Sequence, residues 1–309
     1  MSDSSLTLVI LAAGRSRRYG RLKQLDPMGP GGAALLDYAI YDGFHGGFDR
    51  FVLVVAPGME PEFDNHLSPA RAYGVTIELV VQEDRKATPG LARERPWGTG
   101  FALLSAREAV SSDFGVCNAD DFYGRAAVKD MADALTSSGS GALLVPYPLS
   151  ETLSDRGGVS RGLCRTSPEG RLVEMVEGLD LTRAEDGLVR GRDPRGRLLE
   201  VGQDTPVSMN LWGFRPTVWP LLSEAFRNFT QADPGPEDEF YLSEFVHRAV
   251  QAGRLTCQVL RPAHGWLGVT FPGDRVTAAE SLAQRTSKGL YPRRLWDPSQ
   301  PRKGGDACS

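Results

Sequence analysis

The chain has 309 residues, of which 41% are hydrophobic and 24% are charged, a composition that is typical of a folded globular protein and excludes fibrous and wholly disordered classes. Lys and Arg number 35 against 39 Asp and Glu, so the formal net charge is −4 and no net positive field exists to hold a polyanion. We therefore expect no nucleic-acid partner.

Cysteine usage and hydropathy bear on the compartment and on membranes. The four cysteines include no CxxC pair, so their spacing supports neither a disulfide framework nor a zinc site. The apolar segment Leu6–Ala13 is far shorter than the ~20 residues that span a bilayer, and no basic segment precedes it. We expect a cytoplasmic protein with no membrane partner.

Short apolar segments alternate with amphipathic ones over the first half of the chain. The apolar segments are bounded by Gly, Pro, Asp or Asn, as buried strands are, and the segments between them place apolar residues three and four apart, as helices do. This alternation predicts βα units on a parallel sheet. The expected strands are Leu6–Ala12, Arg50–Ala56, Val75–Gln82, Phe114–Asn118 and Ala142–Pro146, and the expected helices are Ala33–Phe44, Glu60–Tyr73, Gly100–Val110 and Val128–Leu135.

The pattern changes from about Gly157. A turn at Ser167–Gly170 separates two strand-like segments and predicts a hairpin. The polar, Gly- and Arg-rich stretch Asp180–Asp204 predicts an excursion over the surface. The remaining expected elements, hairpin strands included, are strands Val159–Arg165, Arg171–Val176, Val207–Phe214, Thr256–Arg261 and Gly265–Thr270, and helices Thr217–Phe229, Glu237–Ala252 and Asp274–Ala283.

The loop that follows the first strand is the most informative segment. Between Leu11 and Leu25 the chain turns at Gly14 and then carries four arginines and a lysine within nine residues. Backbone N–H groups of such a turn can approach phosphate oxygens, and neighbouring cations neutralise a polyphosphate, although an exposed basic loop has the same composition. The five cations are Arg15, Arg17, Arg18, Arg21 and Lys23.

This loop resembles the LxAGxGxRxxxxKxL signature of the sugar-1-phosphate nucleotidylyltransferases, and it fits neither GxGxxG nor GxxxxGK[ST]. Ser16 stands in place of the second glycine, which resembles the AAGRSxR form of molybdopterin and methylerythritol cytidylyltransferases. The resemblance implies an α/β protein with a three-layer α/β/α, Rossmann-like (GT-A-like) nucleotidyltransferase fold and a mostly parallel central sheet. The matching positions are Ala13, Gly14, Arg18, Lys23 and Leu25.

The same resemblance implies a domain division. Residues 1–284 would form the nucleotidyltransferase domain, with a nucleotide-binding half of about 1–150 and a sugar-binding half of about 151–284. Residues 285–309 are rich in Pro, Gly and Arg, which is typical of a tail, and Tyr291 and Trp296 are candidates to dock it on the body.

Two further segments of the first half resemble nucleotide-binding motifs of this family. Val80–Gln82 resembles the strand end whose Gln reads the base, since its amide complements uracil or thymine and, when flipped, cytosine. Pro96–Ala102 resembles the PLGTGxA turn that opens a helix. The residues implied to bind nucleotide are Leu11, Ala12, Ala13, Gly14, Arg15, Gln82, Gly98 and Thr99.

An apolar strand, Phe114–Asn118, leads into two carboxylates, Asp120 and Asp121. Acids at the carboxyl end of a parallel strand lie where α/β sheets bind ligands and offer the oxygens that Mg²⁺ prefers, although such a pair can also cap a helix. The resemblance implies that Asp120 is the Mg²⁺ ligand and that it forms the catalytic set with Arg18 and Lys23.

Sugar-binding residues are implied by three segments of the second half. Val173–Glu177 resembles the segment whose last Glu binds sugar hydroxyls, Val207–Phe214 resembles the strand that lines the sugar pocket, and Glu239–Ser243 resembles an ExYLTD segment. The residues implied are Gly158, Glu177, Ser208 and Asn210.

Two positions depart from the family pattern. Gly268 stands where many relatives carry a second metal-binding Asp, which leaves three alternatives open: Asp274 as the second ligand, Thr270 as the second ligand, or Asp120 as the single carboxylate. Gly178 stands where many thymidylyltransferases carry a phosphate-binding Lys.

The expected reaction joins an NTP, with UTP or dTTP favoured, to a sugar 1-phosphate by Mg²⁺-assisted in-line attack, giving an NDP-sugar and pyrophosphate. Two alternatives stay open: a cytidylyltransferase that acts on a non-sugar phosphate, and a catalytically silent nucleotide-sugar-binding regulatory protein. The sugar, the pathway and the choice between monomer and homo-oligomer also stay open.

Overall fold

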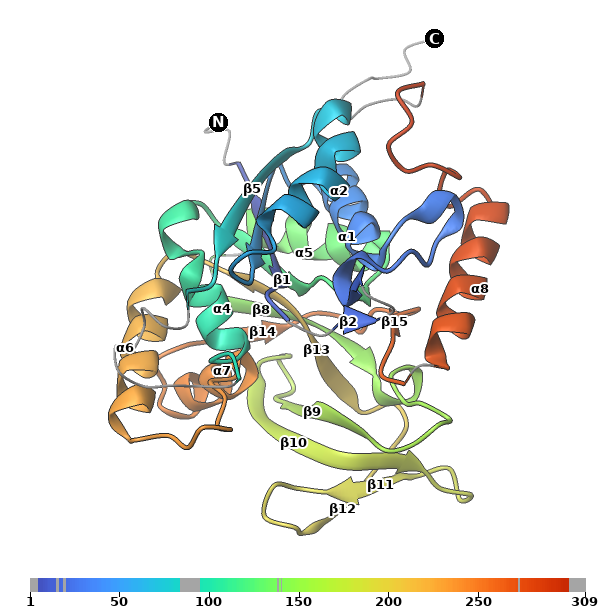
Figure 1. Ribbon diagram of the computed structural model, residues 1–309. Coiled ribbons are helices and arrows are strands. Elements are labelled where there is room, and N and C mark those ends of the chain that lie inside the picture. The colour runs from blue at the N-terminus through green and yellow to red at the C-terminus, as the bar shows by residue number, and fades with distance from the viewer. Residues whose placement is uncertain are drawn as a thin grey trace.

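A mixed sheet of 11 strands runs through the computed structural model, in the order β12-β11-β10-β9-β13-β6-β1-β4-β5, with β8 paired to β13 and β14 (Figure 1). The structure describes residues 5–14, 17–18, 21–83, 95–137, 139, 141–271 and 273–299. The strands of this sheet are β1 (Thr7–Ala12), β4 (Arg50–Val55), β5 (Thr76–Val81), β6 (Phe114–Asn118), β8 (Ala142–Pro148), β9 (Val159–Thr166), β10 (Leu172–Arg183), β11 (Val189–Arg192), β12 (Leu198–Val201), β13 (Pro206–Phe214) and β14 (Cys257–Val259).

The core of the sheet is formed by four parallel strands in the order β6-β1-β4-β5. Every residue of β1 is buried, as a strand covered on both faces requires. The predicted strand at Phe114–Asn118 is confirmed as β6 with the same bounds. Three-layer packing around parallel core strands confirms the predicted fold class.

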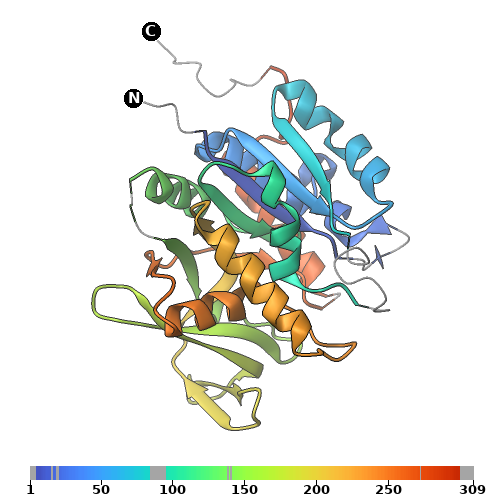
Figure 2. The same cartoon turned by 90° about the vertical axis from the view of Figure 1, so that its left-hand side faces the viewer.

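Helices cover both faces of this core. On one face α1 contacts α5 and α2, with His66 of α2 bonded to Asp37 of α1, and on the other α4 contacts α6 and α7. Figure 2 views the molecule from the side on which α6 and α7 lie in front of the sheet. The helices are α1 (Leu35–Gly46), α2 (Glu60–Tyr73), α4 (Thr99–Ser105), α5 (Arg125–Ser137), α6 (Val218–Gln231), α7 (Leu242–Gln251) and α8 (Asp274–Ser287).

The second half of the sheet is antiparallel. Strand β13 pairs antiparallel with β6, β8 and β9, so β8 does not continue the parallel core as the sequence predicted. The stretch predicted as a surface excursion forms the end of β10 together with β11 and β12, an antiparallel arm. A continuous apolar run identifies a buried strand but carries no information on its neighbour or direction, which explains the first difference.

Helix α7 begins at Leu242 rather than at the predicted Glu237. The preceding segment is extended because the Phe240 N–H donates to the Trp97 carbonyl (2.7 Å) and the Phe240 carbonyl accepts from the Gly100 N–H (2.8 Å). The Oγ1 of Thr99 then accepts from the Leu242 N–H at 3.0 Å and satisfies an amide of the first turn. These contacts join α7 to the start of α4.

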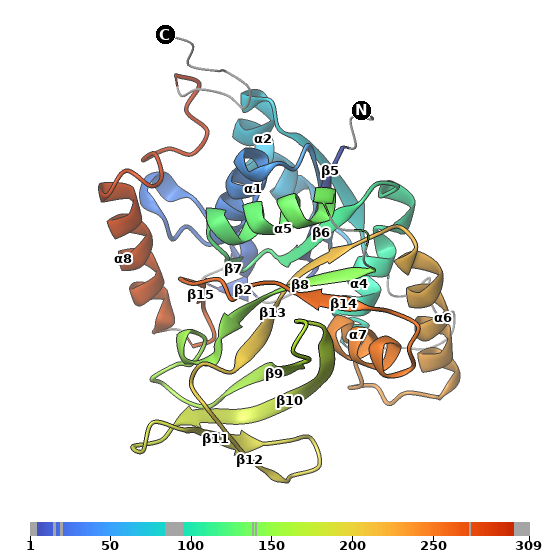
Figure 3. The same ribbon diagram turned by 180° about the vertical axis from the view of Figure 1, so that it is seen from behind.

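The C-terminal segment docks on α1 (Figure 3). Tyr291 is 5% exposed and donates its hydroxyl to Asp42 at 2.8 Å, and the Trp296 indole N–H donates to Asp37 at 3.4 Å. Burial raises the pKa of the Asp42 carboxyl to about 7, despite the opposing effects of Tyr291 and Arg125. The predicted docking through Tyr291 and Trp296 is therefore seen in the structure.

Candidate active site

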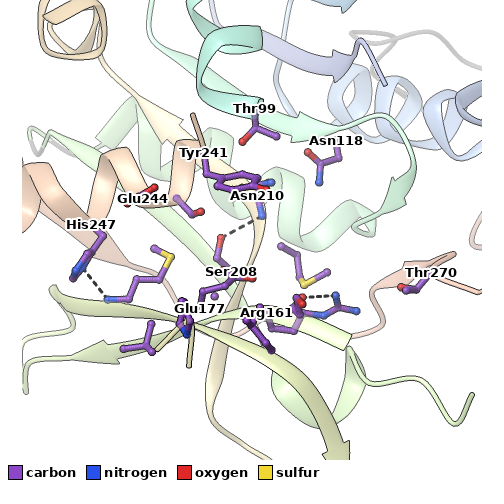
Figure 4. Close-up of a pocket in the computed structure, with 18 of the residues that line it drawn as sticks. Thr99, Asn118, Arg161, Glu177, Ser208, Asn210, Tyr241, Glu244, His247 and Thr270 are labelled. Carbon is purple, nitrogen blue, oxygen red and sulfur yellow. Dashed lines mark hydrogen bonds between the residues drawn. The ribbon is translucent and has the colours of Figure 1, made fainter. Parts of the chain in front are cut away.

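A cavity of about 1220 Å³ opens between the carboxyl ends of the parallel strands and the antiparallel half of the sheet (Figure 4). Its lining joins residues of the first half, Lys23, Thr99, Asn118 and Asp120, to polar side chains of the second half. In open α/β sheets, ligands bind in the crevice just beyond the carboxyl ends of the strands. The cavity is therefore the candidate substrate site.

Lys23 and Asp120 meet at the first-half end of the cavity. Lys23 begins the 3₁₀ turn η1 (Lys23–Leu25), and Asp120 lies two residues beyond the end of β6. The Lys23 Nζ lies 2.5 Å from the Asp120 Oδ2, with side-chain exposures of 19% and 34%. Two groups that are 97 residues apart in sequence thus form one ion pair at the carboxyl ends of the parallel strands.

Asp121 is held beside this pair but is buried. Its Oδ2 accepts from the Asn118 side-chain amide at 2.9 Å and from the Tyr123 hydroxyl at 3.2 Å. Burial, reinforced by the charge of Asp120, raises the pKa of Asp121 to about 7. Asp121 belongs to β7 (Asp121–Phe122), which pairs antiparallel with β15 (Leu267–Gly268).

The turn after β1 is braced by Gln24, which sequence reasoning did not single out. The Gln24 side-chain amide donates to the Gly14 carbonyl at 2.8 Å, and a Cβ on Gly14 would lie 2.9 Å from that nitrogen. The Gln24 Oε1 is buried and finds no hydrogen-bond partner among the residues that the structure describes. A buried acceptor without a donor costs free energy unless a ligand or water supplies one. Leu11, Ala12 and Ala13 are buried beside this turn.

The side chains of two predicted cations, Arg15 and Arg18, are not described by the structure. Arg18 belongs to β2 (Arg17–Arg18), which pairs with β3 (Arg21–Leu22), but its side chain is not described. Arg15 lies outside the described residues. Their roles stay predictions.

Gln82 and Gly98 flank the segment that leads into α4. Gln82 is 2% exposed, and its N–H donates to the Val55 carbonyl at 2.8 Å. Gly98 has φ +93, and a Cβ there would lie 2.9 Å from the Phe240 carbonyl oxygen. The requirement for glycine at position 98 thus comes from its backbone conformation and from close packing on Phe240.

Predicted acceptor-binding residues line the opposite wall of the cavity. Glu177 lies on β10, and Ser208 and Asn210 lie on β13, all facing the same space in Figure 4. The Asn210 N–H donates to the Ser208 hydroxyl at 3.3 Å, and the Trp212 indole N–H donates to the Asn210 Oδ1 at 3.2 Å. These two side chains are therefore held in place before a ligand arrives.

A cation on β9, the strand that pairs with β10, lies close to Glu177: Arg161 pairs with Gly178, the next residue along β10. Arg161 donates to the Thr152 and Ser160 carbonyls, and its guanidinium lies 5.3 Å from the centre of the Trp266 ring. The Glu177 side chain is exposed to the cavity, but the cavity walls shield it from bulk water. This desolvation raises the pKa of the Glu177 carboxyl, although the nearby positive charge of Arg161 acts to lower it. The sequence alone assigned no role to Arg161 or Trp266, because each lies in an ordinary strand-like segment without a motif around it.

Of the residues predicted to bind the sugar or the metal, Gly158 and Asp274 lie outside the cavity lining. A Cβ on Gly158 would meet the Asp180 backbone at 2.8 Å, so this glycine permits close packing of the arm. The Asp274 carboxylate accepts from the Thr270 and Phe271 N–H groups and from the Ser154 hydroxyl, and these bonds occupy it at the start of α8. The structure therefore does not bring Asp274 to Asp120.

Steric packing explains why a glycine occupies position 268. It pairs with Asp121 in the β15–β7 ladder, and a Cβ at this position would lie 2.3 Å from the Trp266 ring and 2.9 Å from the Asp121 Oδ1. The space that a carboxylate at position 268 would need is filled by the indole. Asp120 and Asp121 are therefore the acids at this point of the described structure.

Comparison with known proteins shows the fold and one similar sequence. The chain matches no family model. The bifunctional protein GlmU of Gluconacetobacter diazotrophicus is 26% identical over 283 residues, which cover 90% of this chain and 51% of that protein. The chain thus spans about half the length of this relative. In the part of the chain that the structure describes, no helix is both long and apolar enough to cross a membrane.

Three solved structures share the fold over 90% of this chain. They are an inositol-1-phosphate CTP transferase from T. maritima (TM-score 0.60, 17% identity, 96% of that chain), a protein assigned as a glucose-1-phosphate thymidylyltransferase from Bacillus anthracis in complex with sucrose (0.61, 14%, 95%), and a UDP-glucose pyrophosphorylase complexed with UDP-glucose (0.55, 14%, 98%). These structures show that the chain has the nucleotidyltransferase fold. Its signature loop and its sequence relative make it similar to the sugar-1-phosphate nucleotidylyltransferases.

Proposed function

We propose that the protein is a nucleotidylyltransferase that joins an NTP, with UTP or dTTP favoured, to a sugar 1-phosphate and releases pyrophosphate. The observation that carries the proposal is the meeting of Lys23 with Asp120 at the strand ends, at one end of a cavity whose other wall is polar. The acceptor phosphate would attack the α-phosphorus in line, so the reaction needs no covalent intermediate.

Lys23 supplies positive charge where the reaction develops negative charge. Its ammonium is fixed at the cavity mouth by η1, and it can contact both the attacked phosphate and the incoming one. Prearranged charge of this kind contributes much of the rate enhancement of phosphoryl transfer. We assign the pyrophosphate-binding role to Arg18 and to the amides of the turn at Gly14, as the family resemblance implies.

Asp120 is the residue that would hold Mg²⁺. Mg²⁺ is commonly bound by one or two carboxylates, with waters and substrate phosphates completing its shell, so a single accessible carboxylate fits. The described residues form no group of three or more His, Cys, Asp or Glu that could hold a metal by themselves. When bound, the ion would neutralise phosphate charge, and Asn118 and Tyr123 would keep Asp121 fixed beside it.

The second half of the chain would bind the sugar. Glu177, Ser208 and Asn210 offer acceptors and donors on two neighbouring strands, which is the chemistry that recognises hydroxyl groups. The bonds among Ser208, Asn210 and Trp212 fix these groups in advance, and this lowers the entropic cost of binding.

The nucleotide would lie between the turn at Gly14 and the start of α4. Gln82 and the backbone at Gly98 would read the base, and the unpaired Gln24 Oε1 would accept a hydrogen bond from the bound nucleotide or from the turn as it closes. A site built on hydrogen bonds discriminates strongly, because a wrong base leaves buried polar groups unpaired at about 1–3 kcal/mol each.

A pyrophosphate-release screen tests the proposal directly. UTP, dTTP, CTP, GTP and ATP are each offered with a panel of sugar 1-phosphates, and kcat/KM is measured for the best pairs and repeated with Gln82→Glu, whose carboxylate cannot donate to the base. We expect pyrimidine triphosphates to be used and the preference to change in the variant. Purine preference, or an unchanged profile, would refute the assignment of the base.

One alternative has specific support. A solved neighbour of this fold is an inositol-1-phosphate CTP transferase, and the AAGRS loop resembles that of cytidylyltransferases. CTP use with a non-sugar phosphate in the same screen would identify this activity. Nucleotide-sugar binding without any pyrophosphate release would identify the silent regulatory protein, for which Gly268 is the sequence argument.

A further inference from the structure

The Lys23–Asp120 ion pair places a cation against the carboxylate that would hold a metal. The Nζ to Oδ2 distance is 2.5 Å, and both side chains are partly shielded from water, so the attraction is stronger than in a fully exposed pair. One ammonium thus already satisfies an Asp120 oxygen in the free protein.

The neighbouring acid offers no alternative place for a cation. The Asp121 Oδ2 accepts from Asn118 and Tyr123, and its Oδ1 faces the backbone of Gly268, whose added Cβ would be 2.9 Å away. Asp121 is also only 8% exposed. Both acids line the cavity, but the Asp120 side chain is 34% exposed, so Asp120 is the more accessible carboxylate at this strand end.

We propose that, in the free protein, the Lys23 ammonium occupies the place beside the Asp120 carboxylate where a divalent ion would bind. The ion therefore binds there only together with a nucleotide. The inference rests on the proposed function, since it concerns the metal and the triphosphate of that reaction. An ammonium and a metal ion compete for the same carboxylate and repel each other. A triphosphate gives Lys23 a new anionic partner and brings the ion with it, which relieves both effects.

The competition predicts that removal of a catalytic lysine strengthens metal binding. Mn²⁺ is the probe, because free Mn²⁺ is counted directly by its electron paramagnetic resonance signal. We titrate the full chain with Mn²⁺ in the absence of nucleotide and compare wild type with Lys23→Gln. We expect Lys23→Gln to bind one Mn²⁺ about tenfold or more tightly than wild type does, the ratio that corresponds to loss of one partly shielded ion pair.

Three variants control the experiment. Lys129→Gln removes a lysine from another ion pair of 2.5 Å, with Asp133 on α5, and should leave Mn²⁺ binding as in wild type. Lys23→Arg keeps the charge and should keep binding weak. The double variant Lys23→Gln with Asp120→Asn should lose the gain, because the oxygen that Lys23 vacates is no longer charged.

The outcomes separate this inference from the proposed function. A gain in Lys23→Gln that disappears in the double variant supports it. Equal Mn²⁺ affinity of wild type and folded Lys23→Gln overturns it, and so does tight one-site binding by the wild-type protein, which is measurable even if the variant fails to fold. In either of those cases, Mg²⁺-dependent pyrophosphate release by the wild type would still support the proposed function.

Discussion

The two halves of the sheet present functional groups in different ways. In the parallel half, strands such as β1 are buried throughout, and charged side chains such as Lys23 and Asp120 reach the cavity from beyond the strand ends. In the antiparallel half, β10 and β13 expose one face to the cavity, so Glu177, Ser208 and Asn210 lie within strands. The first arrangement gathers charge at one point, whereas the second spreads hydrogen-bonding groups over a surface.

This difference suggests a division of labour that mutations can test. Charge gathered at one point suits the reacting phosphates, whereas a polar surface suits a ligand with many hydroxyls. Substitutions in the parallel half should therefore lower kcat, and substitutions on the antiparallel face should raise the KM for the acceptor.

The largest effect is expected for Asp120→Asn. The amide keeps the shape but loses the charge that would hold Mg²⁺ and pair with Lys23, so kcat/KM should fall by about 10³ or more. Initial rates of pyrophosphate release over a Mg²⁺ series measure it. Asp130→Asn, at an exposed position of α5, is the matched control. Activity and Mg²⁺ dependence equal to wild type would move the metal site elsewhere.

Lys23→Ala should lower kcat by about 10²–10³ with a much smaller change in nucleotide affinity, because the ammonium is needed most when the transition state gains charge. Single-turnover rates and equilibrium binding of a non-hydrolysable NTP separate the two quantities. Equal losses in affinity and in rate would show that Lys23 acts in binding alone.

A stability experiment probes the buried side of the parallel half. The pKa of Asp42 is raised to about 7 by burial, above its ordinary value of 3.8, so the folded protein keeps a proton that the unfolded chain releases. The free energy of unfolding should therefore fall as pH rises from about 4 to about 7, by a few kcal/mol.

Asp42→Asn should remove this part of the pH dependence, and Asp155→Asn, at an exposed position, should not. Urea unfolding at several pH values measures both. Parallel stability profiles of wild type and Asp42→Asn would show that the Asp42 carboxyl titrates normally.

Glu177→Gln is expected to have the smallest of these effects. Loss of a charged acceptor for a sugar hydroxyl should raise the acceptor KM roughly tenfold and leave kcat and the KM for NTP close to wild type. Steady-state kinetics with each substrate varied in turn tests this expectation. A fall in kcat without a change in acceptor KM would contradict the division between the halves.

Local patterns were sufficient to predict most elements. Helix α2 has the predicted bounds, Glu60–Tyr73, because its spacing of apolar residues and its C-terminal Gly74 are both local signals. The predicted pairing of β8 was wrong because strand neighbours are set by tertiary packing. The strands of the arm, β11 and β12, were missed because they are only four residues long and lie in a stretch rich in Arg, Gly and Asp.

The structure brings together several residues that the motifs singled out: Lys23 and Asp120 form an ion pair, and Glu177, Ser208 and Asn210 line the same cavity. Their roles stay predictions. Gln24 and Arg161 were missed or left unassigned because their importance depends on a carbonyl or a ring that folding brings near. The Trp266 ring, which excludes a side chain at position 268, could likewise not be inferred from the sequence alone.

The contact between Gly268 and the Trp266 indole also restricts how this chain can evolve. A carboxylate cannot enter at position 268 while the indole stands 2.3 Å from the Cβ that it would require, so Gly268→Asp alone would be strongly selected against. A smaller residue at position 266 has to arise first or together with it, which makes the two positions epistatic. Descendants of this sequence should therefore carry a side chain at position 268 only where the Trp at position 266 has been replaced by a smaller residue.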